Sequence, residues 1–118
     1  MAFDFEKLDV YQGALSFADS VYELSAQFPR DEVYGLTGQL RRAAVSVAVN
    51  IAEGSGRSKK EFAHYLRMAR TSVYECVPLL TIAQRQGYVD HDGFGVFYRR
   101  CESLSKMLSK LINSLRRS

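Results

Sequence analysis

The feature that most constrains the fold is the stretch 36–54, which is apolar on two sides when it is read as a helix at about 100° per residue. One stripe consists of Leu36, Leu40, Ala43, Ala44, Val47 and Ile51. A second stripe lies roughly opposite and consists of Val45, Ala48, Val49 and Ala52. A polar seam separates them: Gln39, Arg42, Ser46, Asn50 and Glu53. A core on one side covers one stripe only, so we expect the other to be covered by something else, most simply a second copy of the chain.

The segment from about residue 6 to residue 27 has the same double pattern. One stripe consists of Leu8, Tyr11, Leu15, Ala18 and Tyr22, and the other of Val10, Ala14, Phe17, Val21, Leu24 and Phe28. This helix should end at Phe28-Pro29, because the residue before a proline avoids the α conformation. We expect the oligomer interface to be built from both segments, by Val45, Val49, Ala52, Val10, Phe17 and Val21.

Three further helices are expected after Pro29. The first runs from Asp31 or Glu32 to Gly54, and the second opens at Ser58 with an S-x-x-E capping box and stops near Gly87. Within the second, Pro78 predicts a kink one turn earlier. The last follows the turn 90–93. No segment alternates as a strand does, so residues 1–118 are expected to form one all-α domain, an antiparallel up-down four-helix bundle.

Composition excludes several classes of protein. No run approaches about 18 consecutive apolar residues, so no transmembrane helix is expected. Residues 1–8 contain Asp4 and Glu6 and lack the apolar centre of a signal peptide, so we expect a cytoplasmic protein. Cys76 and Cys101 lie on core stripes and no C-x-x-C occurs, so both are expected to be buried free thiols.

The charge is unevenly distributed along the chain. The net charge is +3, but residues 1–57 hold five Lys/Arg and eight Asp/Glu, whereas residues 58–118 hold eleven and five. Four basic residues fall in one sector of the last helix, namely Arg99, Lys106, Lys110 and Arg117. Two more, Lys59 and Lys60, lie at the start of the third helix. A basic row of this kind is often only the solvated face of a helix. The uneven charge is also compatible with head-to-tail contacts between subunits. A row of this length would also follow a phosphate backbone, which favours nucleic-acid binding.

No motif predicts a reaction. Glu61 and His64 form an E-x-x-H pair as in di-iron bundles, but the second copy and the extra glutamates are missing, so we expect no metal and no cofactor. The turn 54–60 has the glycines and cations of a phosphate cradle, although two helix caps explain it equally. Arg42, Asn50 and Glu53 are expected to form a structural polar network that fixes helix register. An acid/base site there has no nucleophile within reach, so the protein is not expected to be an enzyme.

Several segments together resemble a known family. They are Phe28-Pro29, Tyr34-Gly35-Leu36-Thr37, Gln39-Leu40-Arg41-Arg42-Ala43-Ala44-Val45-Ser46, Asn50-Ile51-Ala52-Glu53-Gly54 and Glu61-Phe62. The resemblance is to the four-helix-bundle family named after the protein encoded in 23S rRNA intervening sequences, and it covers essentially the whole chain. The chain departs from the family pattern at Ala48, where proline is common, and at Thr71, where glycine is usual.

The resemblance implies a ring of five subunits. The family is similar to the accessory proteins of diversity-generating retroelements, which form basic five-fold barrels, bind nucleic acid and associate with a reverse transcriptase. For this chain the resemblance implies a non-enzymatic accessory protein that binds RNA or an RNA–DNA complex, with a reverse transcriptase as a further partner. The alternative is a scaffold ring that contacts proteins and no nucleic acid.

Overall fold

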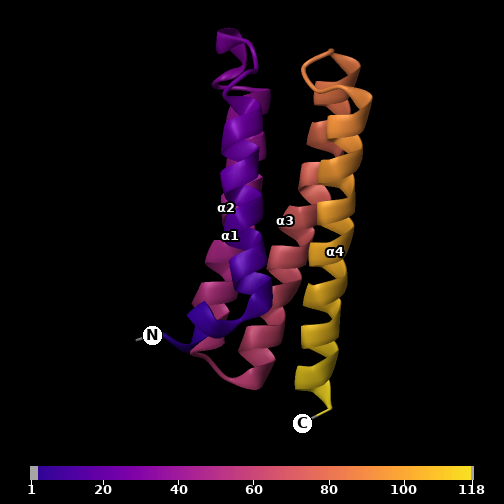
Figure 1. The fold of residues 1–118 in the computed structure, drawn as a ribbon. Coiled ribbons are helices and arrows are strands. Elements are labelled where there is room, and N and C mark those ends of the chain that lie inside the picture. Colours follow the sequence, from indigo (N-terminus) through magenta and orange to yellow (C-terminus); the bar gives the residue numbers. More distant parts are fainter. Residues whose placement is uncertain (1–2, 118) are drawn as a thin grey trace.

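The computed structural model describes residues 3–117, which form four α-helices and no strand. The helices are α1 (Asp9–Ser25), α2 (Leu36–Ser55), α3 (Lys59–Arg85) and α4 (His91–Arg116), with short 3-10 helices η1 (Asp4–Lys7) and η2 (Arg30–Glu32) before α1 and α2. The connections α1–α2 and α3–α4 lie at one end, and the connection α2–α3 lies at the other (Figure 1). The prediction of an all-α fold with four helices is confirmed.

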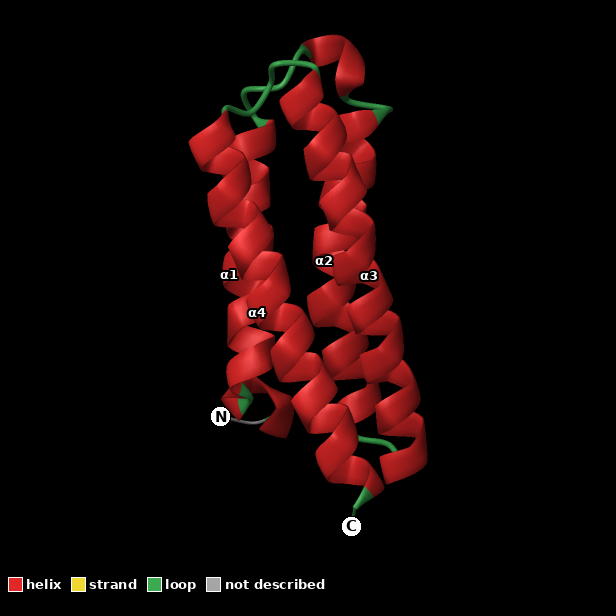
Figure 2. Cartoon of the chain, turned by 90° about the vertical axis from the view of Figure 1, so that its right-hand side faces the viewer, coloured by secondary structure: helices red, strands yellow, loops and turns green. Residues whose placement is uncertain are grey.

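The bundle is elongated, with extents of 46 × 24 × 21 Å. Helix α3 packs along both α2 and α4, whereas α1 packs mainly on α2 and less on α4. All four helices run along the long axis of the bundle (Figure 2). The first stripe of α2 is buried as expected, and its neighbours in the core include Phe17, Leu66, Leu80 and Leu108. None of the helices within residues 3–117 is long and apolar enough to cross a membrane.

Two helices begin later than the sequence pattern predicts. Residues 4–7 form η1, and Leu8 has an extended backbone, with φ −74° and ψ 125°, so α1 starts only at Asp9. Similarly, the residues after Pro29 form η2, and Gly35 is non-helical at φ −113° and ψ −113°, so α2 starts at Leu36. The acidic residue Glu32, expected inside the helix, instead accepts the Leu36 N–H with its carboxylate at 3.3 Å.

The ends of α3 follow the predicted chemistry. The Ser58 hydroxyl accepts the Glu61 N–H at 3.2 Å and donates to the Glu61 carboxylate at 3.0 Å. At the other end Gly87 has φ +82°, and the Tyr88 N–H donates to the Ala83 carbonyl at 2.9 Å, which is a Schellman ending. Helix α3 continues unbroken across Pro78. Helix α4 starts at His91, inside the predicted turn, because Asp90 caps it by accepting the Gly93 N–H at 2.7 Å.

Gly54 ends the apolar pattern of α2 and is also a contact point between helices. A Cβ atom at this position would lie 2.6 Å from Tyr65 Cβ and 3.0 Å from Phe62 Cδ1, both on α3. The close approach of α2 and α3 near their connection therefore requires a glycine.

We expect Gly54→Ala to lower the free energy of unfolding by about 1–3 kcal/mol, because α3 must move to admit the methyl group. Urea unfolding monitored by circular dichroism measures this as a lower midpoint at an unchanged m-value. The matched control is Gly56→Ala, where a Cβ would meet no atom within 4 Å and φ is −90°. Equal midpoints for the two variants would contradict the close-approach explanation.

Candidate oligomer and nucleic-acid interfaces

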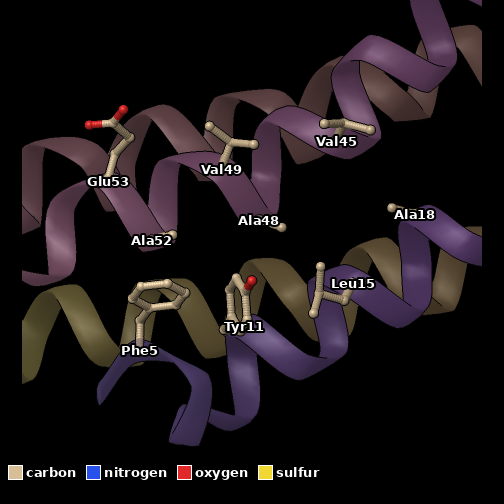
Figure 3. A pocket seen from close by; sticks show the side chains of 9 residues that line it. All are labelled: Phe5, Tyr11, Leu15, Ala18, Val45, Ala48, Val49, Ala52 and Glu53. Carbon is tan, nitrogen blue, oxygen red and sulfur yellow. The ribbon is translucent and has the colours of Figure 1, made fainter. Parts of the chain in front are cut away.

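An apolar groove runs between α1 and α2 (Figure 3). It has a volume of about 450 Å³ and is lined by Phe5, Tyr11, Leu15, Ala18, Val45, Ala48, Val49, Ala52 and Glu53. Three aliphatic side chains along it are exposed, namely Leu15 (38%), Val45 (37%) and Val49 (51%). Two residues of the second apolar stripe of α2, Val45 and Val49, are therefore exposed, whereas Ala48 is buried and Ala52 is half-buried. The groove is the surface that a partner would cover.

The predicted contribution of α1 to the oligomer interface does not agree with the structure. Val10, Phe17 and Val21 are buried in the chain's own core, where the Phe17 ring lies 6.1 Å from that of Phe97. The other stripe of α1 borders the groove, with Tyr11 and Leu15. Both stripes of α1 are apolar, so the sequence pattern alone could not show which of them the core would use.

A cationic surface covers the half of α3 and α4 that lies near the α2–α3 connection. Its residues are Lys59, Lys60, Arg67 and Arg70 on α3, Lys106, Lys110 and Arg116 on α4, and Arg117 directly after α4. A hollow of about 320 Å³ is lined by Lys59, Lys60, Arg67 and Arg116, with Ala63 and Leu115. The hollow joins the predicted pair Lys59 and Lys60 to Arg67 and Arg116. The predicted row of Arg99, Lys106, Lys110 and Arg117 does not line it. We call the eight basic residues together the cationic α3–α4 face. Arg99 lies on the same sector of α4, further from the hollow.

Arg67, Arg70 and Arg116 also belong to this face, although the basic row and pair expected from the sequence did not include them. Arg67 follows Lys60 by seven residues, two helical turns, and that spacing is a signal that could have placed it. Arg116 could not be placed from sequence, because its position in the hollow depends on how the end of α4 meets the start of α3.

The positive charge of this face is not neutralised by ion pairs within residues 3–117. Residues 3–117 contain two ion pairs, and both involve Arg57 rather than the cationic face. Arg70 donates a hydrogen bond to the Ser109 hydroxyl at 2.9 Å, which leaves its charge in place. Unpaired cations gathered on one surface raise the local potential and attract anionic partners.

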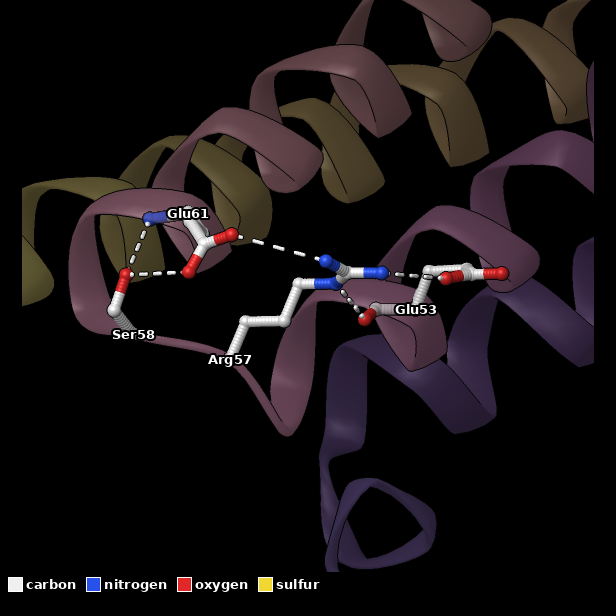
Figure 4. Close-up of polar contacts among 4 residues, drawn as sticks. All are labelled: Glu53, Arg57, Ser58 and Glu61. Carbon is white, nitrogen blue, oxygen red and sulfur yellow. Dashed lines mark hydrogen bonds and ion pairs between the residues drawn. The ribbon is translucent and has the colours of Figure 1, made fainter.

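Arg57, in the turn between α2 and α3, is held in place by its neighbours (Figure 4). Arg57 lies between two carboxylates, with Nη2 3.4 Å from Glu53 and Nη1 3.7 Å from Glu61. Its Nε donates to the Glu53 carbonyl at 3.1 Å, and its guanidinium stacks over the Tyr65 ring at 4.9 Å. The geometry favours two helix caps over a phosphate cradle here.

The polar seam of α2 is divided between separate partners. Asn50 donates to the Ser46 carbonyl and to the Ser46 hydroxyl, both at 2.9 Å, and Ser72 of α3 donates to that same hydroxyl at 3.0 Å. Glu53 pairs with Arg57, while Arg42 is exposed and joins neither group. The register between α2 and α3 is thus held by Asn50, Ser46 and Ser72, and a network that includes Arg42 is not formed.

Cys76 and Cys101 are buried free thiols, as predicted. Burial raises the pKa of the Cys76 thiol to about 12, with smaller contributions from Cys101 and Glu75. Burial also raises the pKa of the Cys101 thiol to about 11, against a small opposing effect of Arg100. Neither thiol is therefore a nucleophile near neutral pH.

We expect thiol reagents to modify both cysteines slowly in the native protein and at once in denaturant. As the pH rises above the ordinary thiol pKa of 9.0, the unfolded chain releases both thiol protons. The folded chain keeps these protons to higher pH, because the pKa is about 11 at Cys101 and about 12 at Cys76. The free energy of unfolding should consequently fall as the pH rises above the ordinary thiol pKa. Ellman titration and urea midpoints against pH check both results, and native labelling of either thiol at the rate of free cysteine would contradict them.

These surfaces define a small four-helix protein with an apolar groove between α1 and α2 and a cationic surface on α3 and α4. Residues 6–110 match the model of the 23S rRNA-intervening sequence protein family, and the chain belongs to this family. The fold is also that of a crystal structure of a protein with unknown function from the S23 ribosomal protein family of Bacteroides thetaiotaomicron. The two chains share 21% identity with a TM-score of 0.81, over 87% of this chain and 97% of that chain. No curated protein matches the chain.

Proposed function

We propose that this protein is a non-enzymatic, oligomeric accessory protein that binds RNA through the phosphate backbone. The observation that carries the proposal is the unneutralised charge around the α3–α4 hollow, where Lys59, Lys60, Arg67 and Arg116 converge. Lysine and arginine at exposed positions exchange condensed counterions for phosphates, and this gives affinity without sequence preference. The family's link to 23S rRNA intervening sequences supports RNA as the nucleic acid.

An exposed apolar groove on the opposite side of the bundle supports the proposed oligomer. Antiparallel bundles would associate through the α1–α2 groove, where Leu15, Val45 and Val49 are too exposed for a monomer to retain without cost. A closed ring is the arrangement expected from the family resemblance, with five subunits. Such a ring would display several copies of the cationic α3–α4 face and bind RNA more tightly than a single chain.

Fluorescence anisotropy with a short single-stranded RNA tests the proposal. The logarithm of the affinity should fall linearly with the logarithm of the salt concentration, with a slope of about −0.7 for each phosphate contacted. Four contacts at the hollow would give a slope of about −3. Absence of binding at low salt, or affinity that does not change with salt, would contradict RNA binding and favour the protein-contacting scaffold ring.

A further inference from the structure

A second hollow lies at the end of the bundle where α1 ends and α2 begins. It has a volume of about 320 Å³, and its lining includes Ser25, Phe28, Arg30, Val33, Thr37 and Arg41. Two of these side chains are cationic, and no carboxylate lines the hollow. The α1–α2 connection is at the opposite end from the α2–α3 connection, so this site is separate from the cationic α3–α4 face (Figure 1).

Thr37 carries the clearest indication of a missing ligand. Its side chain is only 5% exposed, and its hydroxyl is the one buried side-chain polar atom within residues 3–117 that has no hydrogen-bond partner. A buried hydroxyl without a partner destabilises the folded state, so such groups are rare in proteins. A ligand in the hollow that accepts this hydroxyl proton would remove the cost.

Arg41 is held in a fixed position beside this hydroxyl. Its Nε donates to the Ser25 hydroxyl at 2.8 Å, and that hydroxyl donates to the Val21 carbonyl at 2.7 Å. Its guanidinium carbon lies 4.7 Å from the centre of the Tyr22 ring. Only Nε is engaged, so the two Nη groups keep their donors available. An arginine fixed by stacking and one hydrogen bond is preorganised to bind an anion.

The start of α2 adds further donors. Gly35 offers no side-chain cap, and the N–H groups of Thr37 and Gly38 meet no acceptor within the described chain. The carboxylate of Glu32 occupies part of this helix end, where one oxygen accepts the Leu36 N–H at 3.3 Å and the other accepts the Tyr88 hydroxyl at 3.0 Å. The N–H groups of Thr37 and Gly38 therefore remain as donors beside this carboxylate.

We propose that this hollow binds the phosphate group of a small phosphate monoester. The phosphate oxygens would accept from the Arg41 Nη groups and from the Thr37 hydroxyl, with Arg30 adding charge at the edge. Phe28 and Val33 provide apolar walls for the carbon part of the ligand. A phosphate has more acceptor oxygens than a carboxylate and therefore suits this number of donors better. The proposal is independent of RNA binding and of the ring.

Thermal unfolding with phenyl phosphate, inorganic phosphate and benzoate tests this assignment. The melting temperature should rise most with phenyl phosphate, less with inorganic phosphate and least with benzoate. In a titration with phenyl phosphate, the NMR signals of the Arg41 Nε–H group and the Thr37 amide should shift. A rise with benzoate equal to that with phenyl phosphate would overturn the phosphate assignment.

Two variants separate the site from general effects. Thr37→Val removes the hydroxyl at nearly the same volume, so it should raise the melting temperature without ligand and weaken phenyl phosphate about tenfold. Arg41→Gln should abolish the ligand-dependent rise. The control is the double variant Lys59→Gln and Lys60→Gln, which removes cations at the far end and should retain the rise. The same rise in wild type, Arg41→Gln and Thr37→Val would overturn the proposal.

Discussion

Replacing Lys60, Arg67 and Lys110 by glutamine is expected to weaken RNA binding by about a hundredfold at low salt. All three side chains are exposed on the cationic α3–α4 face, and none forms an ion pair with another described residue. Each lost phosphate contact should also reduce the salt slope by about 0.7, so the triple variant should lose about two units of slope. Anisotropy titrations of wild type and variant across salt concentrations measure both effects.

The matched control removes the same charge elsewhere on the surface. Lys7, Arg42 and Arg85 are exposed and lie outside the cationic α3–α4 face, so changing these three to glutamine alters net charge equally. We expect the control to lower affinity only slightly and to keep the salt slope. If both triple variants lost affinity to the same extent, net charge and not this face would determine binding.

The second large effect is expected at the α1–α2 groove, where Val45→Asp together with Val49→Asp should convert the oligomer to single chains. Both valines are exposed in one chain, so the bundle itself should fold. In an assembly, however, each new carboxylate would be buried against a sister chain without a partner, at a cost of several kcal/mol. Light scattering after size exclusion would detect the change in mass.

The control for this variant places the same charges on other exposed apolar positions. Ile82 on α3 is 47% exposed and Val96 on α4 is 46% exposed, and both lie outside the groove. The double variant Ile82→Asp and Val96→Asp should keep the mass of wild type. Circular dichroism should show equal helix content for all variants. An unchanged mass for the Val45 and Val49 variant would contradict assembly through this groove.

Much of the fold could be predicted because the residues that cap helices and the spacing of the apolar residues indicate the same helices. Ser58 and Gly87 mark the ends of α3 by side-chain capping and by a positive φ, and both effects depend on neighbouring residues only. The first stripe of α2 was predicted correctly for the same reason. The late start of α2 was not predicted, since Gly35 adopts a non-helical backbone that composition does not specify.

The interfaces were harder to predict because they depend on contacts distant in sequence. On α1, Phe17 and Leu15 belong to two apolar stripes of similar strength, and only the position of α4 and α2 decides which one is buried. Arg41 and Ser25 are sixteen residues apart, and their hydrogen bond appears only when α1 and α2 lie together. The unpaired Thr37 hydroxyl has no sequence signal at all, because threonine in a first helical turn is ordinary.

The central claim is that sister chains cover the apolar groove of each bundle, so that the cationic α3–α4 face is presented in several copies. Sedimentation equilibrium of the wild-type protein over a range of concentrations tests it most directly. We expect a mass that is a multiple of the 13.4 kDa mass of one chain. For the expected ring of five subunits, the mass should be five times that of one chain. A well-folded particle of 13.4 kDa at every concentration would contradict it.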